Sequence, residues 1–257
     1  MAVDKRSEVR ALKPEGGLRT AVESEIGALL SRIFESNPAS TEKKLENFPK
    51  YIRRQKVTRY LALYELFKLV LPLKGSIVEC GVHEGFGLAA IANFSAVLEP
   101  NNLTRRIYGF DTFSGFSDVG VKDSSKAYTP RAGDLAADSY EELSQLFELY
   151  DQNRFLGHVK KVELVKGDIR KTAAQFLKEN PHLLVSLLFL DLDLYEPTKA
   201  ALQAFVPRMP KGSILAFDEL DNPIWPGETL ALLETLGVRD MKLSRFEFDP
   251  YIAYTVI

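Results

Sequence analysis

A glycine-rich turn between a predicted strand and a predicted helix constrains this chain more than any other feature. Residues 76–78, Ser-Ile-Val, predict a short strand, Glu79 follows, and the alanine-rich residues 88–98 predict a helix. Between them lie Gly81, Gly85 and Gly87. Such a turn lets a ligand lie against bare backbone while the helix N-terminus points at it. The stretch therefore predicts a ligand site in which Glu79 accepts hydrogen bonds from an amine or hydroxyl.

The spacing of these glycines narrows the choice of ligand. A dinucleotide fingerprint, G-x-G-x-x-G, requires glycine where His83 stands, and a P-loop requires a final Gly-Lys-Ser/Thr that this stretch lacks. The remaining pattern, acid-x-Gly-x-x-x-Gly-x-Gly, resembles the first motif of class I S-adenosylmethionine (SAM) methyltransferases. A simple turn without a ligand remains the alternative. The resemblance implies SAM contacts at Glu79, Gly81, Val82, Gly85 and Gly87.

The composition is that of an ordinary globular protein and argues against several classes. With 257 residues, 46% hydrophobic and 26% charged, the chain fits one α/β domain with additions. The net charge of −2 argues against a nucleic-acid partner. Without a membrane-length apolar run or a signal peptide, we expect a cytoplasmic protein with no membrane partner. One cysteine, Cys80, and three scattered histidines argue against a disulfide and a structural zinc site.

Residues 1–50 are predicted to form an N-terminal helical arm, and residues 51–257 the SAM-binding domain. In the arm, residues 21–34 carry apolar side chains at helical spacing. The next predicted helix, 51–71, begins with basic residues that include Arg53 and Arg54. They form either a solvated face, which we favour, or a grip on a substrate phosphate or carboxylate. The arm could cap the ligand or mediate subunit contact, and we expect a homo-oligomer.

Acidic residues follow the later predicted strands. Residues 107–110 predict a strand that ends at Asp111, where a doubly wound fold binds ribose hydroxyls. Residues 112–135, rich in Ser, Gly, Asp and Pro, form a longer segment than a simple connecting loop needs, and they predict a substrate lid. After a third strand, 162–165, Asp168 could meet an adenine, cap the next helix, or do both. The cofactor contacts expected here are Asp111, Thr112, Phe113, Asp168 and Ile169.

Two more predicted strands end in carboxylates. Residues 185–190 are apolar except for Ser186, as in a parallel strand buried on both faces, and Asp191-Leu192-Asp193 follows. Residues 212–217 precede Asp218-Glu219. Because ligands lie beyond the carboxyl ends of such strands, these acids should share one crevice and repel unless protonated or bridged by a cation. Oxygen ligation suits Mg²⁺, Mn²⁺ or Ca²⁺. Alternatively, Asp218 caps the next helix and Asp193 lies at the surface.

Strands that alternate with helices predict a mostly parallel sheet with right-handed crossovers and helices on both faces. Residues 242–257 alternate and turn like a β-hairpin, which adds an antiparallel pair at the end of the chain. The expected fold is therefore the α/β, Rossmann-like, seven-stranded sheet of class I SAM methyltransferases, with the arm and the lid as additions.

Several longer stretches resemble one family within this class. They are RQKVTRYLALYELFK, GSIVECGVHEGFG, LEPNNLTRRIYGFDTFSGF, FLDLDLYEPTKAAL and VPRMPKGSILAFDELDNPIWPGET. From about Tyr51 onward the chain is similar to the macrocin and mycinamicin O-methyltransferases, which methylate sugar hydroxyls in antibiotic pathways with SAM and a divalent metal, usually Mg²⁺. The resemblance implies metal ligation by Asp191, Asp218 and Glu219, although the best-known members have Asp at the third position.

The resemblance also implies direct methyl transfer from SAM to a sugar oxygen. A metal at that oxygen lowers the hydroxyl's pKa and a carboxylate takes the proton; we expect Asp191 to be ligand and base, with His83 as the rival base. We expect a nucleotide-linked 6-deoxyhexose such as rhamnose, because basic residues could pair with its diphosphate. A sugar already on a natural-product scaffold, the alternative, would favour an apolar, aromatic-lined mouth. Candidate substrate contacts are Arg53, Arg54, Tyr128, Arg131, Tyr195 and Trp225.

Two other functions compete with this interpretation. Some relatives carry a cephalosporin-hydroxylase label, but iron and oxygen chemistry needs two histidines and a carboxylate. None of His83, His158 and His182 begins an H-x-D/E motif. The second alternative is a non-catalytic SAM-binding domain that assembles with partners, and the intact acids at 191, 218 and 219 argue against it.

Overall fold

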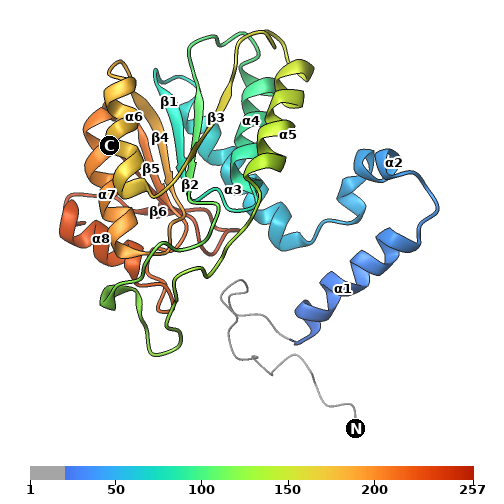
Figure 1. Ribbon diagram of the computed structural model, residues 1–257, viewed down its shortest axis with the longest axis horizontal. Coiled ribbons are helices and arrows are strands. Elements are labelled where there is room, and N and C mark those ends of the chain that lie inside the picture. Colours follow the sequence, from blue (N-terminus) through green and yellow to red (C-terminus); the bar gives the residue numbers. More distant parts are fainter. Residues whose placement is uncertain (1–20) are drawn as a thin grey trace. The chain divides into compact units, whose positions relative to one another are not determined.

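The structure, a computed structural model, describes residues 21–257 and divides the chain into two compact units, Met1–Arg59 and Tyr60–Ile257 (Figure 1). The division falls inside helix α3 (Arg54–Val70). The domain boundaries predicted from the sequence, 1–50 and 51–257, remain a prediction. The two units are described separately below.

The first unit contains the predicted amphipathic helix, α1 (Ala21–Ser36), followed by α2 (Thr41–Glu46) and the 3₁₀ turn η1 (Phe48–Lys50). Ser40 caps α2, because its hydroxyl accepts the backbone N–H of Lys43 at 3.3 Å. The chain then folds back toward the end of α1. There the amide of Asn37 donates to the Tyr51 hydroxyl at 2.9 Å, and the Tyr51 ring packs edge-on against Phe34.

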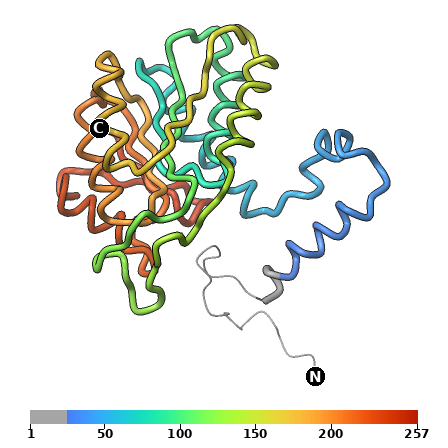
Figure 2. The backbone as a smooth tube through the Cα atoms, in the orientation of Figure 1, coloured from blue at the N-terminus to red at the C-terminus, as the bar shows by residue number. Residues whose placement is uncertain are grey.

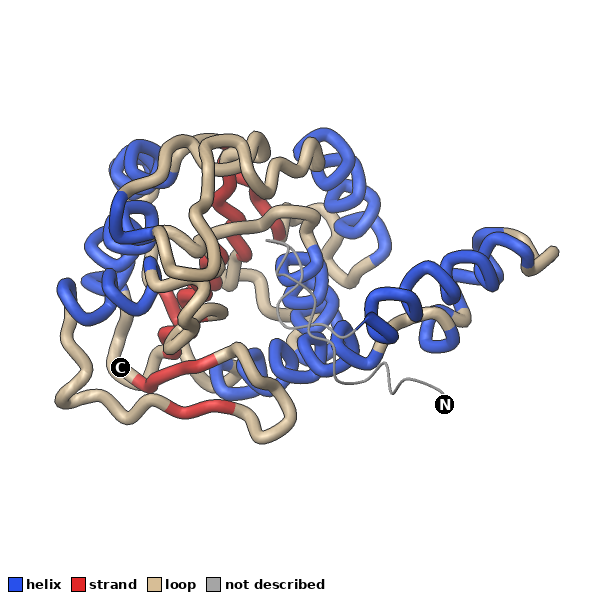
Figure 3. Tube along the Cα trace, turned by 90° about the horizontal axis from the view of Figure 1, so that it is seen from below, coloured by secondary structure: helices blue, strands red, loops and turns tan. Residues whose placement is uncertain are grey.

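The second unit is built on a seven-stranded sheet with the order β3-β2-β1-β4-β5-β7-β6 (Figure 1). The first five strands in sequence are parallel, and β7 runs antiparallel to β5 and to β6. The antiparallel pair lies beside the C-terminus in Figure 3. This order confirms the predicted class I methyltransferase fold. The strands are β1 (Ser76–Cys80), β2 (Ile107–Asp111), β3 (Val162–Lys166), β4 (Val185–Leu190), β5 (Ile214–Phe217), β6 (Ser244–Arg245) and β7 (Ala253–Val256).

Helices cover both faces of this sheet and create two apolar cores. Alternate residues of one strand serve different cores: Ile77 packs with α3, α4 and α5, whereas Val78 packs with α6, α7 and α8. All residues of β1 and β4 are buried, so these strands lie at the centre of the domain. The helices are α4 (Phe86–Leu98), α5 (Tyr140–Asn153), α6 (Ile169–Glu179), α7 (Tyr195–Phe205) and α8 (Gly227–Thr235), with 3₁₀ turns η2 (Val121–Asp123) and η3 (Val206–Arg208).

Two element boundaries differ from the sequence prediction for physical reasons. Strand β1 continues beyond residue 78 through Glu79, because ladder pairing with β2 and β4 extends to Cys80 on both sides. Strand β6 has two residues, whereas the alternating pattern covered 242–248. An edge strand has a partner on one side, and a short one exposes few unpaired backbone groups. Stacking of Phe246 on Tyr254 continues the contact beyond the ladder.

The lid connects β2 to α5 as irregular chain with one 3₁₀ turn, η2, and is the green segment beyond the strand ends in Figure 2. Among the described residues, no helix combines the length and apolar character needed to cross a membrane.

Gly81 offers a direct test of how tightly the turn after β1 is packed. Its φ is +93°, and a Cβ there would lie 1.8 Å from the carbonyl oxygen of Asp191. Gly81→Ala should lower the free energy of unfolding by about 3 kcal/mol or more, because backbone must move as well as adopt a strained φ. Urea unfolding measures the loss.

The matched control is Gly133→Ala in the lid. Gly133 has a similar φ of +84°, but a Cβ there would meet nothing within 4 Å. Its expected loss is about 1 kcal/mol, from the left-handed backbone alone. Equal losses at the two glycines would show that contact with Asp191 contributes nothing.

Candidate active site

The turn after β1 is joined to its neighbours on both sides by backbone hydrogen bonds. The N–H of Gly81 donates to the Phe110 carbonyl at the end of β2, and the N–H of Asp191 donates to the Cys80 carbonyl, both at 2.8 Å. These bonds bring the predicted cofactor turn directly beside the loop after β4. The strand-end arrangement that the sequence predicts is therefore present.

Glu79 lies beneath the first turn of α4. Its side chain is 1% exposed, and a Cβ on Gly87 would be 2.1 Å from Glu79 Oε1. The glycine thus makes room for the carboxylate, and a carboxylate at a helix N-terminus is stabilised by the helix dipole. Gly85, at the N-cap of α4, completes the turn. The glycines thus serve the protein's own packing at positions 81 and 87 and a positive φ of +84° at Gly85, and the SAM contacts of these residues remain a prediction.

Asp111 ties three backbone segments together. Its Oδ2 accepts the N–H groups of Val82 and His83 at 2.7 and 2.8 Å, and its Oδ1 accepts that of Phe113 at 2.6 Å. A carboxylate has about four acceptor positions, so these bonds leave room for one ligand hydroxyl. The side chain therefore shapes the turn, and its contact with SAM remains a prediction. Beside it, the Thr112 hydroxyl donates to the Gly115 carbonyl at 2.6 Å.

Asp168 caps α6, as one of its two predicted roles requires. It accepts the backbone N–H of Arg170 at 3.0 Å and also binds the Arg170 guanidinium, which lowers the pKa of the carboxyl. The same guanidinium bonds Asp118 in the lid at 2.9 Å. Ile169 is buried in the core, so its side chain is committed to packing. Contact of Asp168 with an adenine remains a prediction.

His83 connects the cofactor turn to the far end of the lid. It is exposed, has a φ of 50°, and places Nδ1 3.2 Å from the Leu135 carbonyl. The Ser139 hydroxyl donates to the His83 carbonyl at 2.5 Å. These contacts describe an anchoring residue, and its role as the rival base remains a prediction.

The acids after β4 and β5 lie near one another. The N–H of Asp218 donates to the Leu190 carbonyl at 2.9 Å, which sets the two loops side by side. Asp218 does not cap the next helix, since α8 begins at Gly227 with Pro226 before it. Asp193 is 9% exposed with a φ of 60°, so it is buried in a strained conformation and is not at the surface. The alternative interpretation of these acids is therefore wrong.

The pKa of Glu219 is affected by burial and by the negative charges around it. Burial raises the pKa of its carboxyl well above the usual value, and the charges of Asp218, Asp193 and Asp191 raise it further. A hydrogen bond donated by the Asn222 amide to Glu219 acts in the opposite direction. A divalent cation would relieve this repulsion, and carboxylate oxygens are suitable ligands for Mg²⁺.

The donor chemistry of Asp191, Asp218 and Glu219 therefore fits a hard cation. Within residues 21–257, however, no three His, Cys, Asp or Glu side chains are already gathered in a metal-binding geometry. The carboxylates would have to turn toward a shared ion. The metal assignment remains a proposal.

Glu228 is a site residue that the sequence did not reveal. It is fully buried at the start of α8. Its Oε1 accepts the N–H groups of Leu192 and Asp193 at 2.8 and 3.2 Å. Its Oε2 accepts the N–H of Glu219 at 3.1 Å. Burial, followed by the charge of Asp191, raises the pKa of this carboxyl. Its position after Pro226-Gly227 was a possible signal, because a glutamate there starts a helix, but the pattern does not indicate which way it points.

Two aromatic side chains of the lid pack against Trp225. The Tyr128 hydroxyl donates to Asp134 Oδ2 at 2.6 Å, and its ring packs edge-on against Trp225, with centroids 5.0 Å apart. Phe116 packs on the same indole, which is 5% exposed. Arg131 has an exposed side chain, and its backbone N–H donates to Asp134. The structure thus brings Tyr128 and Trp225 together, as expected for one subsite.

Tyr195 contacts helix α8 and the turn η2 of the lid. It is 4% exposed, its hydroxyl donates to Glu234 on α8 at 2.7 Å, and Lys122 Nζ lies 3.9 Å from its ring centroid. Its N–H donates to Asp123 of the lid at 2.6 Å. These contacts make Tyr195 an anchor for the lid, and its contact with substrate remains a prediction.

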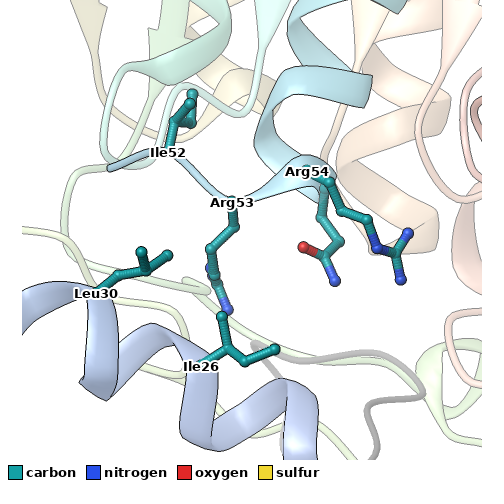
Figure 4. A pocket seen from close by; sticks show the side chains of 6 residues that line it. Ile26, Leu30, Ile52, Arg53 and Arg54 are labelled. Carbon is teal, nitrogen blue, oxygen red and sulfur yellow. The ribbon is translucent and has the colours of Figure 1, made fainter. Parts of the chain in front are cut away.

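Arg53 and Arg54 lie in the first unit. With Ile26, Leu30, Ile52 and Gln55 they line a pocket of about 220 Å³ (Figure 4). The Arg53 side chain packs over α1 at Gly27. The basic residues are therefore part of a hollow with apolar walls.

Comparisons with known proteins identify the family. A profile described as "Methyltransferase domain" matches residues 78–220, which is more than half of the chain. This chain belongs to the methyltransferase domain family. A search of curated protein sequences found no match.

Solved structures that match this methyltransferase include two of CalS11. One, described as calicheamicin methyltransferase, is 38% identical, with a TM-score of 0.88, and the match covers 97% of this chain and 96% of that one. The other, described as TDP-rhamnose 3'-O-methyltransferase, is 37% identical, with a TM-score of 0.80 and coverage of 93% and 95%. The O-methyltransferase NovP shares the fold at 20% identity, with a TM-score of 0.63 and coverage of 91% and 96%. The expectation of a SAM-dependent O-methyltransferase is confirmed.

Glu219 predicts how the stability of this methyltransferase depends on pH when no metal is present. The folded state keeps the carboxyl protonated above the usual glutamate pKa, whereas the unfolded chain releases that proton near pH 4.5. The free energy of unfolding should therefore fall as pH rises above about 4.5, by at most about 1.4 kcal/mol per unit. Glu219→Gln should flatten this slope and stabilise the protein at pH 8.

Urea unfolding of both proteins in EDTA, from pH 5.5 to 8.5, measures these slopes. Glu196→Gln, at an exposed position on α7, is the control and should leave the slope unchanged. Parallel slopes for wild type and Glu219→Gln would show that Glu219 ionises normally.

Proposed function

We propose that this enzyme transfers a methyl group from SAM to a hydroxyl of a deoxysugar during the biosynthesis of an antibiotic or another secondary metabolite. The observation that carries the proposal is the 38% identity to CalS11 over nearly the whole of both chains. CalS11 is described as a TDP-rhamnose 3'-O-methyltransferase of calicheamicin biosynthesis. The wider grouping with the macrocin and mycinamicin enzymes, a homo-oligomeric state and a cytoplasmic location belong to the same proposal.

The proposed acceptor is a nucleotide-linked 6-deoxyhexose such as rhamnose. The description of CalS11 supports it, and so does the pocket that contains Arg53 and Arg54. Guanidinium groups bind phosphate oxygens through paired, charge-assisted hydrogen bonds, and apolar walls suit a base or sugar face. A scaffold-linked sugar is the alternative, and the rings of Phe116, Tyr128 and Trp225 are the feature that would favour it.

The residues that would hold SAM are those at the ends of β1 and β2. Glu79 lies under the N-terminal turn of α4, and Asp111 has one acceptor position left, so both could accept hydrogen bonds from the amine or hydroxyls of SAM. SAM would supply the methyl group to an oxygen nucleophile. The lid, held by Arg170 and Tyr195, would exclude water from this crevice.

Asp191, Asp218 and Glu219 would hold a divalent cation, with Mg²⁺ as the first choice and Mn²⁺ or Ca²⁺ as substitutes. Such an ion would orient the acceptor hydroxyl and lower its pKa. The backbone of Asp191 lies between the cofactor turn and the loop after β5, which supports its carboxylate as the group that would take the hydroxyl proton. His83, which is tied to the lid, is the second candidate for that base.

The central test is methyl transfer from SAM to TDP-rhamnose, with Mg²⁺ or EDTA present. We expect product with Mg²⁺ and none in EDTA. Asp218→Ala should lower kcat by at least about 100-fold and leave SAM affinity within twofold, because Asp218 serves the acceptor side. Calorimetry measures the SAM affinity.

The same assay should include finished rhamnosides as acceptors. Turnover of these alone would replace the nucleotide-linked acceptor by a scaffold-linked one. Full activity in EDTA would remove the metal from the proposal and make His83 the leading base. A lack of SAM binding by the wild-type protein would contradict the proposal that it is a SAM-dependent enzyme.

The arginine pocket yields a separate prediction. Arg53→Ala combined with Arg54→Ala should raise the KM for TDP-rhamnose about tenfold or more, since each lost bond to a phosphate is worth about 1.5–3 kcal/mol. SAM affinity should not change. Steady-state kinetics measures the KM.

The matched control is Lys43→Ala combined with Lys50→Ala. These two exposed cations belong to the same unit but do not line the pocket. Their removal changes net charge equally and should leave KM unchanged. If the arginine variant also keeps the wild-type KM, the basic residues form a solvated face.

A further inference from the structure

Glu228 connects the two loops that carry the proposed metal-binding acids. One carboxylate oxygen binds the loop after β4 through the N–H groups of Leu192 and Asp193, and the other binds the loop after β5 through the N–H of Glu219. The N–H groups of residues adjoining Asp191 and Asp218 therefore converge on a single side chain. That side chain belongs to neither strand.

The start of α8 is shaped to bring this carboxylate into place. A Cβ on Gly227 would lie 2.5 Å from the Asp193 carbonyl oxygen and 2.6 Å from the Tyr195 nitrogen. The helix can therefore begin in direct backbone contact with the loop after β4. Because Glu228 lies in the first turn of α8, the helix dipole also favours its carboxylate.

The hydrogen bonds of Glu228 join the two loops beyond the point where the strands β4 and β5 stop pairing. Between the two strand ends, the ladder closes with the bond from the Asp218 N–H to the Leu190 carbonyl. Beyond that bond, Asp191 and Glu219 lie on loops whose separation depends on other contacts. Asp193 has a left-handed backbone, so the loop after β4 is held in a conformation that its own sequence does not favour. The two N–H bonds to Glu228 counteract that strain.

We infer that Glu228 is a positioning residue that sets the spacing of the two acid loops and thereby the affinity of the enzyme for its divalent cation. The inference rests on the metal site of the proposed function. Glu228 itself is not proposed as a ligand, because both of its oxygens already accept backbone hydrogen bonds.

Glu228→Gln tests this role with little change in volume. An amide has one acceptor oxygen, so in either orientation an NH₂ group faces the N–H of one loop and that loop is released. The Mn²⁺ affinity, measured by electron paramagnetic resonance, and the Mg²⁺ affinity, measured by calorimetry, should each fall about tenfold or more. The Mg²⁺ concentration for half-maximal methyl transfer should rise by the same factor, with SAM affinity within twofold of wild type.

Glu99→Gln is the matched control for a purely structural effect. Glu99 is also a buried glutamate, but it pairs with Arg105 at 3.0 Å and lies outside the acid loops. This variant should lower the melting temperature and leave both metal affinities unchanged. Glu228→Asp, which keeps the charge but is too short to reach both loops, should weaken metal binding and serves if Glu228→Gln does not fold.

Two results would overturn the inference. One is a folded Glu228 variant that binds Mn²⁺ and Mg²⁺ within twofold of wild type. The other is an equal loss of metal affinity in Glu99→Gln, which would attribute the effect to general destabilisation. If the wild-type protein binds neither ion, the proposed metal site fails, and the inference fails with it.

Discussion

Backbone contact between Gly81 and Asp191 is the constraint on which the site depends. The two strands that lead to it, β1 and β4, are buried on both faces, so their ends cannot shift without opening both apolar cores. A Cβ at Gly81 would lie 1.8 Å from the Asp191 carbonyl oxygen, which shows how closely the turn and the loop approach. The predicted SAM turn and the first proposed metal ligand therefore belong to one rigid junction.

Carboxylates hold the surrounding loops to this junction. Asp111 accepts three backbone N–H groups at the ends of β1 and β2, and Glu228 accepts three from the loops after β4 and β5. Asp123 of the lid accepts the N–H of Tyr195 at the start of α7. A carboxyl group suits this work because its two oxygens offer several acceptor positions at once. Burial raises the pKa of Glu219, and the negative charge that this design concentrates raises it further.

Backbone strain gathers at the same end of the sheet. Among the described residues, His83, Phe113, Asp193 and Asp221 have positive φ and follow β1, β2, β4 and β5 respectively, and Leu135 closes the lid. Non-glycine residues rarely adopt this conformation, and it persists where surrounding contacts over-determine it. Each of these four strands therefore leads into a loop whose shape is imposed by neighbouring segments, as expected of a binding crevice.

The sequence by itself determined the sheet and the edge at which ligands bind. A run that is apolar except for Ser186 predicted β4 at its observed bounds, because strands buried on both faces are mostly apolar. Once the strands were predicted, the sequence also showed that an acidic residue follows four of them. Only the tertiary structure decided that Asp193 is buried, that Tyr195 anchors the lid, and that Glu228 joins two loops. These outcomes depend on how α8 and the lid pack against loops distant in sequence, and no local periodicity records the direction of a side chain across such a contact.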